Sequence, residues 1–333
     1  MQRRDYLLKK LGWSLLTIGF VLVLNFFLFR ILPGDPTSSI AKDPRLTPET
    51  RAALAERFGL DKAIFLDLGG GNPFDSQFFA YIGRLAQGDL GTSFNFNRPV
   101  AVLLGERLFN TVLLVLSGQI LAIVLGVGLG LLAAWKNKTA FDAGAITFSL
   151  AAWSLPTFWL GILLLIIGSA VFGLPTAGKQ TVGVDYASWW EQAVDVARHL
   201  ILPTLTFTIV LLGEYMLIMR SSVLEILSED YILTAKAKGM SHTQILRHHA
   251  MQNAMLPIVT LIALNLGFTV AGAIQVETVF SWPGIGSMIY DAVRRQDYPV
   301  LQGAFLLIAV SVVLANLAAD LVYGYLDPRV KAP

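Results

Sequence analysis

Six stretches of this sequence are apolar and long enough to cross a lipid bilayer, and they constrain the fold more than any other feature. A membrane-spanning α-helix needs about 20 apolar residues. Only 14% of the 333 residues are charged, whereas soluble domains carry about 25%. The charges collect between the apolar runs, which predicts an all-α integral membrane protein with six transmembrane helices. The predicted spans cover residues 11–32, 108–134, 145–172, 200–219, 257–280 and 303–325.

Composition excludes several classes of function. The chain contains no cysteine, so disulfides, thiolate metal sites and thiol nucleophiles are ruled out. A net charge of +2 is too small to favour a nucleic-acid partner. The basic N-terminus resembles the start of a signal peptide, but the apolar run after it is too long and lacks a cleavage site. We expect a retained helix.

Lysine and arginine are distributed unevenly between the two sides of the predicted spans. Short cytoplasmic segments of membrane proteins carry an excess of these residues. Twelve of them flank the spans on the side of the N-terminus and four lie in the short segments of the opposite side. Segment 33–107 is left out because long segments cross regardless of charge. Both termini and the segments 135–144 and 220–256 are therefore predicted to be cytoplasmic.

This topology divides the chain into three parts. Residues 1–32 form the cytoplasmic N-terminus and the first transmembrane helix, and residues 33–107 form an extracytoplasmic segment with short helices. Residues 108–333 form a five-helix core that includes the cytoplasmic region 220–256.

Two short helices are predicted in the extracytoplasmic segment. The first runs from Thr47 to Phe58, with a capping residue, a proline and an acid at its start. The second, within residues 74–88, has an apolar stripe that we expect to pack on the protein's own helices or to lie in the membrane interface. The stripe consists of Phe78, Tyr81, Ile82 and Leu85.

The cytoplasmic region contains a polar stretch, SEDYILTAKAKGMSHTQILRHHAMQN (228–253), between two predicted spans. Ser228 is expected to cap a short helix whose last turn carries Lys236 and Lys238, where positive charge suits the helix dipole. Gly239 is expected to end this helix in the left-handed conformation.

A second short helix is predicted to begin at Ser241. Ser241 and Gln244 have the spacing of a capping box, and Met240 and Ile245 have that of a hydrophobic staple. Two short helices should therefore meet at a well-defined corner. The corner is either a docking surface for another protein or a well-capped connector, and the spacing alone does not decide between them.

Three polar residues fall inside predicted spans: Gln119, Glu214 and Asn265. Polar side chains within a membrane mark solute or ion paths, or they bind one another between helices. Each is therefore a candidate for the translocation path or for an interhelical hydrogen bond. For Glu214, a position at the membrane interface is a further alternative.

Two apparent motifs are better explained by the membrane. GLPTAGKQ (173–180) fits a phosphate-binding loop as far as its lysine, but Gln180 replaces the Ser or Thr that would hold magnesium. Gly126, Gly130 and Ala134 lie around an apparent dinucleotide fingerprint, yet they recur every four residues within a span. That spacing favours close packing of transmembrane helices.

The stretch DYILTAKAKGM followed by ILRHHAMQNAMLP resembles the cytoplasmic coupling motif of binding-protein-dependent ABC importer permeases. In that family the motif forms helices that sit in a groove of the ATPase subunit. The short form of the motif has Glu-Ala-Ala where this chain has Leu233, Thr234 and Ala235, and its Leu-Pro pair comes earlier than Leu256 and Pro257 do here. These departures resemble the variant found in the peptide/nickel branch.

Other stretches resemble the same branch and together cover nearly the whole chain in the expected order. They are FRILPGDP (29–36), RFGLD (57–61), GDLGTSF (88–94), RPV (98–100), SLPTFWLG (154–161), ETVFSWPGIG (277–286), QDYP (296–299) and LDPR (326–329).

The resemblance implies a type I ABC importer permease, which is a non-catalytic, multi-pass subunit in the cytoplasmic membrane of a bacterium or archaeon. Such a chain pairs with a homologous second permease, usually as a heterodimer. Two ATPase subunits bind ATP and magnesium beneath it, and an extracytoplasmic solute-binding protein delivers the solute. The chain itself would hold no cofactor or metal. The resemblance places the ATPase contact on Ala235, Lys238, Gly239, Met240, Ser241 and Gln244.

The branch carries di- and oligopeptides, nickel chelates, opines and oligosaccharides, and we expect a peptide. An ion-coupled secondary transporter is the rival from another class, because Glu214 is an intramembrane acid, although no paired broken helices in inverted repeats are evident. An intramembrane enzyme would need a catalytic motif, and neither H-E-x-x-H nor G-x-S-x-G occurs. An ion channel would need a filter, for which SWPGIG is the only candidate.

Overall fold

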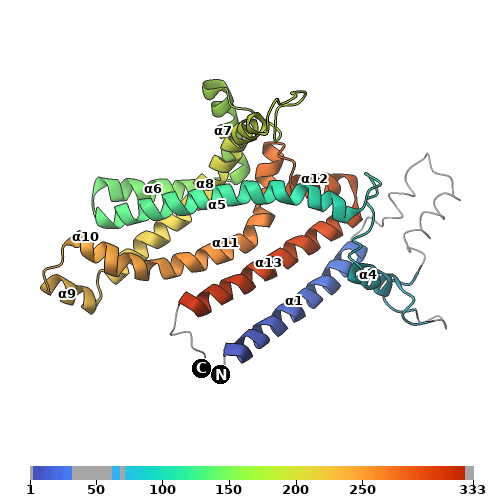
Figure 1. Ribbon diagram of the computed structural model, residues 1–333, viewed down its shortest axis with the longest axis horizontal. Coiled ribbons are helices and arrows are strands. Elements are labelled where there is room, and N and C mark those ends of the chain that lie inside the picture. Colours follow the sequence, from blue (N-terminus) through green and yellow to red (C-terminus); the bar gives the residue numbers. More distant parts are fainter. Residues whose placement is uncertain (1–2, 32–61, 68–71, 327–333) are drawn as a thin grey trace. The chain divides into compact units, whose positions relative to one another are not determined.

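The computed structural model describes residues 3–31, 62–67 and 72–326, which form helices joined mostly by short connections (Figure 1). The helix predicted from Thr47 to Phe58 lies outside these residues. The chain divides into two compact units. Unit 1 contains Met1–Phe109, Met288–Leu317 and Lys331–Pro333, and unit 2 contains Asn110–Ser287 and Ala318–Val330.

The helices range from single turns to spans longer than a membrane is thick. They are, in chain order, α1 (Arg3–Ile31), α4 (Gln77–Ala86), α5 (Val100–Trp135), α6 (Ala140–Ser154), α7 (Thr157–Phe172), α8 (Trp189–Ile226), α9 (Asp230–Ala237), α10 (His242–Ile245), a π-helical turn (Leu246–Ala250), α11 (Met251–Val279), α12 (Ile285–Arg295) and α13 (Tyr298–Leu326).

Four helices in the described part of the chain are long and apolar enough to cross a membrane, namely α1, α5, α8 and α13. The bent pair of α6 and α7 raises the number to five if the pair is one span. An all-helical architecture with several apolar spans is therefore confirmed. The number of six spans stays a prediction.

The span predicted over residues 145–172 is broken into α6 and α7, which meet at 105°. Leu155 between them is extended (φ −76°, ψ 134°), because the ring of a following proline disfavours the helical conformation. Pro156 also lacks the N–H that would continue the helix. Pro156 therefore stands at a complete corner of the chain, whereas Pro203 lies inside α8 without ending it.

The centre of unit 2 is α8, which packs against α6, α7 and α11. Glycines of α5 let that helix approach α8 closely. A Cβ added at Gly126 would lie 2.6 Å from the Cβ of Tyr215, and one at Gly130 would lie 2.7 Å from the carbonyl oxygen of Met216. A Cβ at Gly128, between them, would have no atom within 4 Å. The predicted packing of helices through Gly126 and Gly130 is confirmed.

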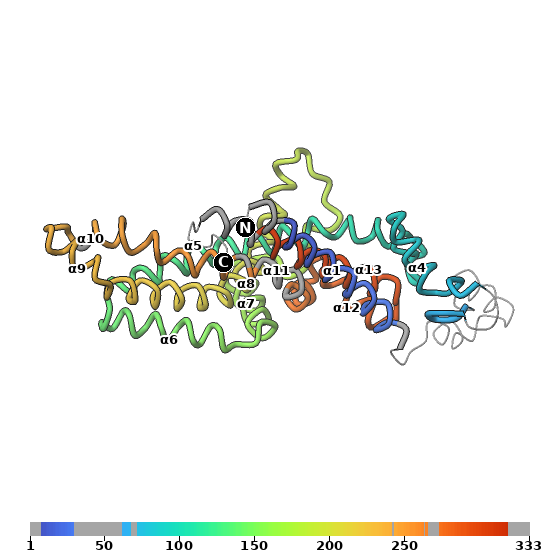
Figure 2. The backbone as a smooth tube through the Cα atoms, turned by 90° about the horizontal axis from the view of Figure 1, so that it is seen from below, coloured from blue at the N-terminus to red at the C-terminus, as the bar shows by residue number. Residues whose placement is uncertain are grey.

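One end of unit 2 carries both of its predicted cytoplasmic segments. In Figures 1 and 2, α9 and α10 lie at the end of the unit where α5 turns into α6. The connector between α7 and α8 lies away from that end. Segments 135–144 and 220–256, which were predicted to share one side of the membrane, therefore lie at one end of the unit.

In unit 1, α4 packs on α1 through aromatic rings. The ring centroid of Phe26 in α1 lies 5.2 Å from that of Phe78 and 5.5 Å from that of Tyr81, both in α4. Phe78 also lies 5.2 Å from Phe65. The stripe predicted within residues 74–88 therefore packs against the protein's own helix.

Two stretches noted in the sequence, GDLGTSF and QDYP, meet in unit 1. The buried carboxylate of Asp297 accepts hydrogen bonds from the Ser93 hydroxyl (2.5 Å) and from the backbone N–H groups of Phe94 (3.2 Å) and Asn95 (3.1 Å). Its backbone carbonyl accepts the amide of Leu301 (3.1 Å) in the first turn of α13. One buried carboxylate thus joins the loop before α5 to the start of α13.

Candidate functional site

The candidate coupling corner consists of α9, Gly239 and α10. Gly239 adopts the left-handed conformation (φ +78°) two residues after the end of α9. Its amide donates to the carbonyl of Lys236 (2.9 Å), and the amide of Met240 donates to the carbonyl of Ala235 (3.3 Å). These two bonds form a Schellman motif, so the predicted left-handed cap at Gly239 is confirmed.

The predicted capping box is also present at the start of α10. The amide of Gln244 donates to the Ser241 hydroxyl (3.3 Å), and the Ser241 amide donates to the side-chain oxygen of Gln244 (2.9 Å). Because the box and the apolar cluster beneath it act together, the angle between α9 and α10 is fixed. That cluster contains Ile226, Leu227, Ile232, Ala235, Met240 and Ile245.

The start of α9 differs from the prediction. The Ser228 hydroxyl donates to the carbonyl of Glu225 (2.6 Å) at the end of α8, and α9 begins at Asp230 without a side-chain cap. The predicted cap at Ser228 is wrong because α8 continues to Ile226, well past the predicted end of its span. A serine directly after a helix has free carbonyls within reach of its hydroxyl.

The residues predicted to contact the ATPase differ in their exposure. Lys238, Gly239, Ser241 and Gln244 are exposed, and Met240 is half-buried. Ala235 is buried beneath the corner. The exposed members of this predicted set therefore form a polar surface over a small apolar core.

Two exposed side chains of α9 are not among the contact residues predicted from the sequence. Leu233 is 59% exposed and Tyr231 is 42% exposed. The signal that could have found them is helical spacing, because Ile232 and Ala235 occupy the inward face and the residues beside them must point elsewhere. The corner thus offers apolar as well as polar contacts.

A cavity of about 540 Å³ lies beside the corner, between the end of α8, the start of α9 and the first turns of α11. Two of its lining residues are joined, since the side-chain amide of Asn253 donates to the hydroxyl of Tyr231 (3.1 Å). The chain enters α11 through the π-helical turn, a feature that is common at functional sites. The residues that line the cavity are Ser222, Glu225, Ile226, Glu229, Tyr231, Asn253, Leu256 and Pro257.

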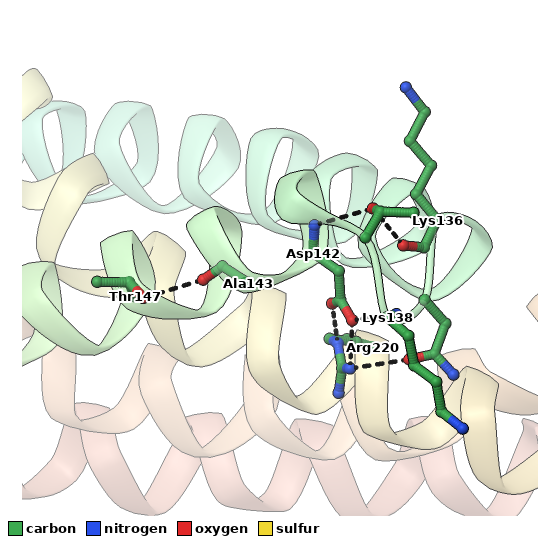
Figure 3. A network of polar contacts seen from close by, with 8 residues as sticks. Lys136, Lys138, Asp142, Ala143, Thr147 and Arg220 are labelled. Atoms are coloured by element: carbon green, nitrogen blue, oxygen red, sulfur yellow. Dashed lines mark hydrogen bonds and ion pairs between the residues drawn. The ribbon is translucent and has the colours of Figure 1, made fainter.

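An ion pair fastens α6 to α8 near the turn that follows α5 (Figure 3). Two nitrogens of the Arg220 guanidinium donate to the two carboxylate oxygens of Asp142, at 2.5 and 2.8 Å. The amide of Lys138 donates to the same carboxylate (2.9 Å). A bidentate pair of this kind is among the stronger polar contacts in proteins. It therefore joins α6 to α8 at the end of unit 2 that carries the corner.

Unit 2 also brings together the three polar residues predicted inside spans. The side-chain amide of Asn265 donates to the carboxylate of Glu214 and to the hydroxyl of Tyr215, both at 3.3 Å. The side-chain amide of Gln119 donates to the same hydroxyl. Tyr215, which sequence reasoning missed, is fully buried and joins α5, α8 and α11 at this point. These four residues are named the intramembrane polar cluster.

The ETVFSWPGIG stretch folds around the buried carboxylate of Glu277. This carboxylate accepts the Thr111 hydroxyl (2.6 Å) and the backbone amide of Ser287 (2.9 Å). The indole N–H of Trp282 donates to the carbonyl of Asn110 (3.0 Å). The stretch is therefore a packed joint that ties α5 to the loop between α11 and α12.

The GLPTAGKQ stretch lies in the connector between α7 and α8, and α8 begins only at Trp189. A phosphate-binding loop leads from a strand directly into a helix N-terminus. Here the stretch follows the helix α7 instead of a strand, and α8 does not begin directly after it. Later in the connector, the Tyr186 hydroxyl donates to the carboxylate of Asp195 (2.6 Å). This hydrogen bond to a negative group raises the pKa of Tyr186.

A family model and several individual relatives all match this chain to the same family of transport proteins. Residues 126–332 match the family described as binding-protein-dependent transport system inner membrane component. The dipeptide transport system permease protein DppB of Escherichia coli (strain K12) is 36% identical over 344 residues, covering 98% of each chain. The di/tripeptide transport system permease protein DppB of Pseudomonas aeruginosa (strain UCBPP-PA14) is 35% identical over 341 residues, with the same coverage. The glutathione transport system permease protein GsiC of Salmonella choleraesuis (strain SC-B67) is 37% identical over 329 residues, covering 98% of this chain and 99% of that protein.

A solved structure has a related fold. The MetNI methionine ABC transporter in an inward-facing conformation aligns with a TM-score of 0.52 and 17% identity, over 68% of this chain and 96% of that chain. The family match covers more than half of the chain, and the relatives extend over almost all of it. The resemblance read from the motifs is therefore confirmed, and this chain belongs to the family of inner membrane components, or permeases, of binding-protein-dependent transport systems.

Proposed function

We propose that this chain is one of two permease subunits of an ATP-driven importer for di- and oligopeptides. A homologous second permease completes the translocation path, two ATPase subunits bind at the corner of α9 and α10, and an extracytoplasmic protein delivers the solute. The observation that carries the proposal is the corner itself. The cap at Gly239 and the box at Ser241 give it one fixed shape and an exposed outer surface.

The choice of a peptide rests on the relatives. Those described above are named for dipeptides, di- and tripeptides, and glutathione, which is itself a small peptide. Nickel chelates, opines and oligosaccharides are therefore the less favoured solutes. An ion-coupled secondary transporter is disfavoured by membership of a binding-protein-dependent family.

The corner transmits the motion of the ATPases to the spans. Lys238 supplies charge at its surface, while Leu233 and Met240 supply apolar contact. Ser241 and Gln244 hold the box and lie on the exposed side, whereas Ala235 and Gly239 keep the corner in shape. Transport then follows from a rigid-body switch between two states, and ATP drives it because the nucleotide-bound ATPases favour one state over the other.

The six-span topology, with both termini in the cytoplasm, belongs to the same proposal. The four apolar helices, the bent pair counted once and α11 would together make six spans. The turn that carries Lys136 and Lys138 lies at the same end of unit 2 as the corner, in agreement with an excess of positive charge on the cytoplasmic side.

Nucleotide and magnesium are assigned to the ATPase subunits, so the chain is proposed to be a non-catalytic subunit without a cofactor of its own. The connector that carries GLPTAGKQ lacks the strand-to-helix geometry of a nucleotide site.

Reconstitution tests the proposed function. The importer is purified with its partner subunits, placed in proteoliposomes and supplied with its binding protein and labelled alanyl-alanine. Uptake is expected to require ATP and every subunit. Uptake by this chain alone, driven by an ion gradient without ATP, would instead establish a secondary transporter.

A further inference from the structure

The intramembrane polar cluster contains a carboxylate without a counter-charge in the described part of the chain. Glu214 is half-buried in α8 and forms no ion pair with any residue that the structure describes. Arg220, the basic residue that follows it on α8, is bound to Asp142. Acidic groups within a membrane are costly unless they are paired. A cation that binds beside the Glu214 carboxylate would therefore be stabilised by its negative charge.

Gln119 leaves a second polar group of the cluster unsatisfied. Gln119 is 1% exposed, and its side-chain nitrogen donates a hydrogen bond to the hydroxyl oxygen of Tyr215. Its amide oxygen has no hydrogen-bond partner among the described residues. Buried polar groups are nearly always hydrogen-bonded, and an unsatisfied one in this position points to a ligand that the cluster receives during its working cycle.

The chemistry of the cluster selects a positively charged ligand that can also make neutral hydrogen bonds. The solutes named for the relatives are dipeptides, di- and tripeptides, and glutathione. Peptides of this kind share an α-amino group, which is largely protonated at neutral pH. A carboxylate beside an unsatisfied amide oxygen matches such an ammonium ion in both charge and hydrogen bonding, because an ammonium group only donates.

We infer that the intramembrane polar cluster binds the ammonium group of the peptide during its passage. Glu214 supplies the negative charge, and the side-chain oxygen of Gln119 supplies a neutral acceptor. Tyr215 positions Gln119, because its hydroxyl oxygen accepts the Gln119 side-chain amide. Asn265 holds the Glu214 carboxylate from α11. The inference rests on the proposed function and adds the chemical group that is recognised inside the membrane.

Glu214→Gln separates charge from hydrogen bonding, because glutamine keeps an acceptor for Asn265 and removes the charge. ATP-driven uptake of alanyl-alanine by the complete importer is expected to fall by about tenfold or more, as for the loss of a hydrogen bond to a charged group. ATP hydrolysis is expected to stay at the wild-type rate. Glu214→Asp keeps the charge and should retain most of the uptake.

Gln119→Met provides a second, independent readout. It removes the unsatisfied amide from a buried position, so a purely structural role predicts an equal or higher Tm and unchanged uptake. The inference predicts reduced uptake without a lower Tm. Glu191→Gln makes the same chemical change as Glu214→Gln at an exposed position of α8, and it is expected to leave uptake unchanged.

Several outcomes would overturn the inference. Wild-type uptake in Glu214→Gln would show that hydrogen bonding alone suffices, and equal losses in Glu214→Gln and Glu214→Asp would show that charge is not the deciding property. Loss of the second permease from the purified Glu214→Gln complex would assign the charge to a subunit contact. Wild-type uptake that requires sodium or a proton gradient would assign the cluster to an inorganic cation. Absence of ATP-driven uptake in the wild-type importer would refute the proposed function instead, so the two failures are distinguishable.

Discussion

Gly239→Ala isolates the conformational demand of the coupling corner. No atom lies within 4 Å of the position that a Cβ would take at Gly239, so alanine meets no steric obstacle there. The cost is therefore that of the left-handed backbone (φ +78°), which is roughly 1–2 kcal/mol for a residue with a Cβ. This energy lowers the population of the native corner, relative to other conformations, by about 5- to 30-fold.

A series of substitutions at Gly239 gives the prediction its sharpest form. Asparagine tolerates the left-handed conformation better than alanine does, and valine tolerates it least because it is β-branched. ATP-driven uptake should therefore decrease in the order glycine, asparagine, alanine, valine. The assay is uptake by proteoliposomes that contain the complete importer, with equal amounts of the chain verified by immunoblot.

The order of the series decides whether the reasoning holds. Uptake in Gly239→Ala that equals the wild-type value would show that the corner does not need the left-handed conformation. Asparagine that performs no better than alanine would show that the loss has another cause. Both outcomes contradict a role for the Schellman motif in coupling.

Three further predictions concern contacts inside each unit, two of them in unit 2 and one in unit 1. Gly130→Ala should lower the Tm because its Cβ would lie 2.7 Å from the Met216 carbonyl oxygen, an overpacking that costs about 1–3 kcal/mol. Gly128→Ala, with open space around it, should be neutral or stabilising by up to about 1 kcal/mol, and equal effects of the two changes would contradict the packing argument. Asp142→Asn weakens the pair with Arg220 and should cost about 1.5–3 kcal/mol, read as a lower Tm of the purified complex, whereas an unchanged Tm would refute a stabilising pair. Asp297→Asn should accelerate hydrogen exchange at the amides of Phe94 and Asn95, which donate to this carboxylate, and unchanged protection would show that the carboxylate does not hold this loop.

Local features of the corner could be predicted from the sequence. The cap at Gly239, the box between Ser241 and Gln244 and the staple from Met240 to Ile245 each depend on residues within a few positions of one another. Backbone geometry alone brings such residues together. A close approach of α5 to another helix was also predictable, because small residues at a spacing of four share one helix face. The sequence did not identify α8 as the partner.

Features that depend on tertiary packing could not be predicted. Asp142 and Arg220 are 78 positions apart, and no local pattern links them. Tyr215 looks like any aromatic residue of a span until α5 and α11 place Gln119 and Asn265 against it. The Ser228 cap failed for a related reason, since packing carries α8 well beyond its most apolar part and leaves Ser228 at a helix end instead of a helix start.

The most direct test of the account is capture of the partner at the corner. The chain contains no cysteine, so Lys238→Cys introduces a single thiol that can carry a thiol-linked photo-crosslinker in native membranes. The control is Val182→Cys in the connector between α7 and α8, where the side chain is 96% exposed. Mass spectrometry of the crosslinked products is expected to identify an ATPase subunit from the Lys238 position and none from the Val182 position. An ATPase captured from Val182, or absent from Lys238 in membranes that carry out ATP-driven uptake, would contradict the assignment of the corner as the coupling site.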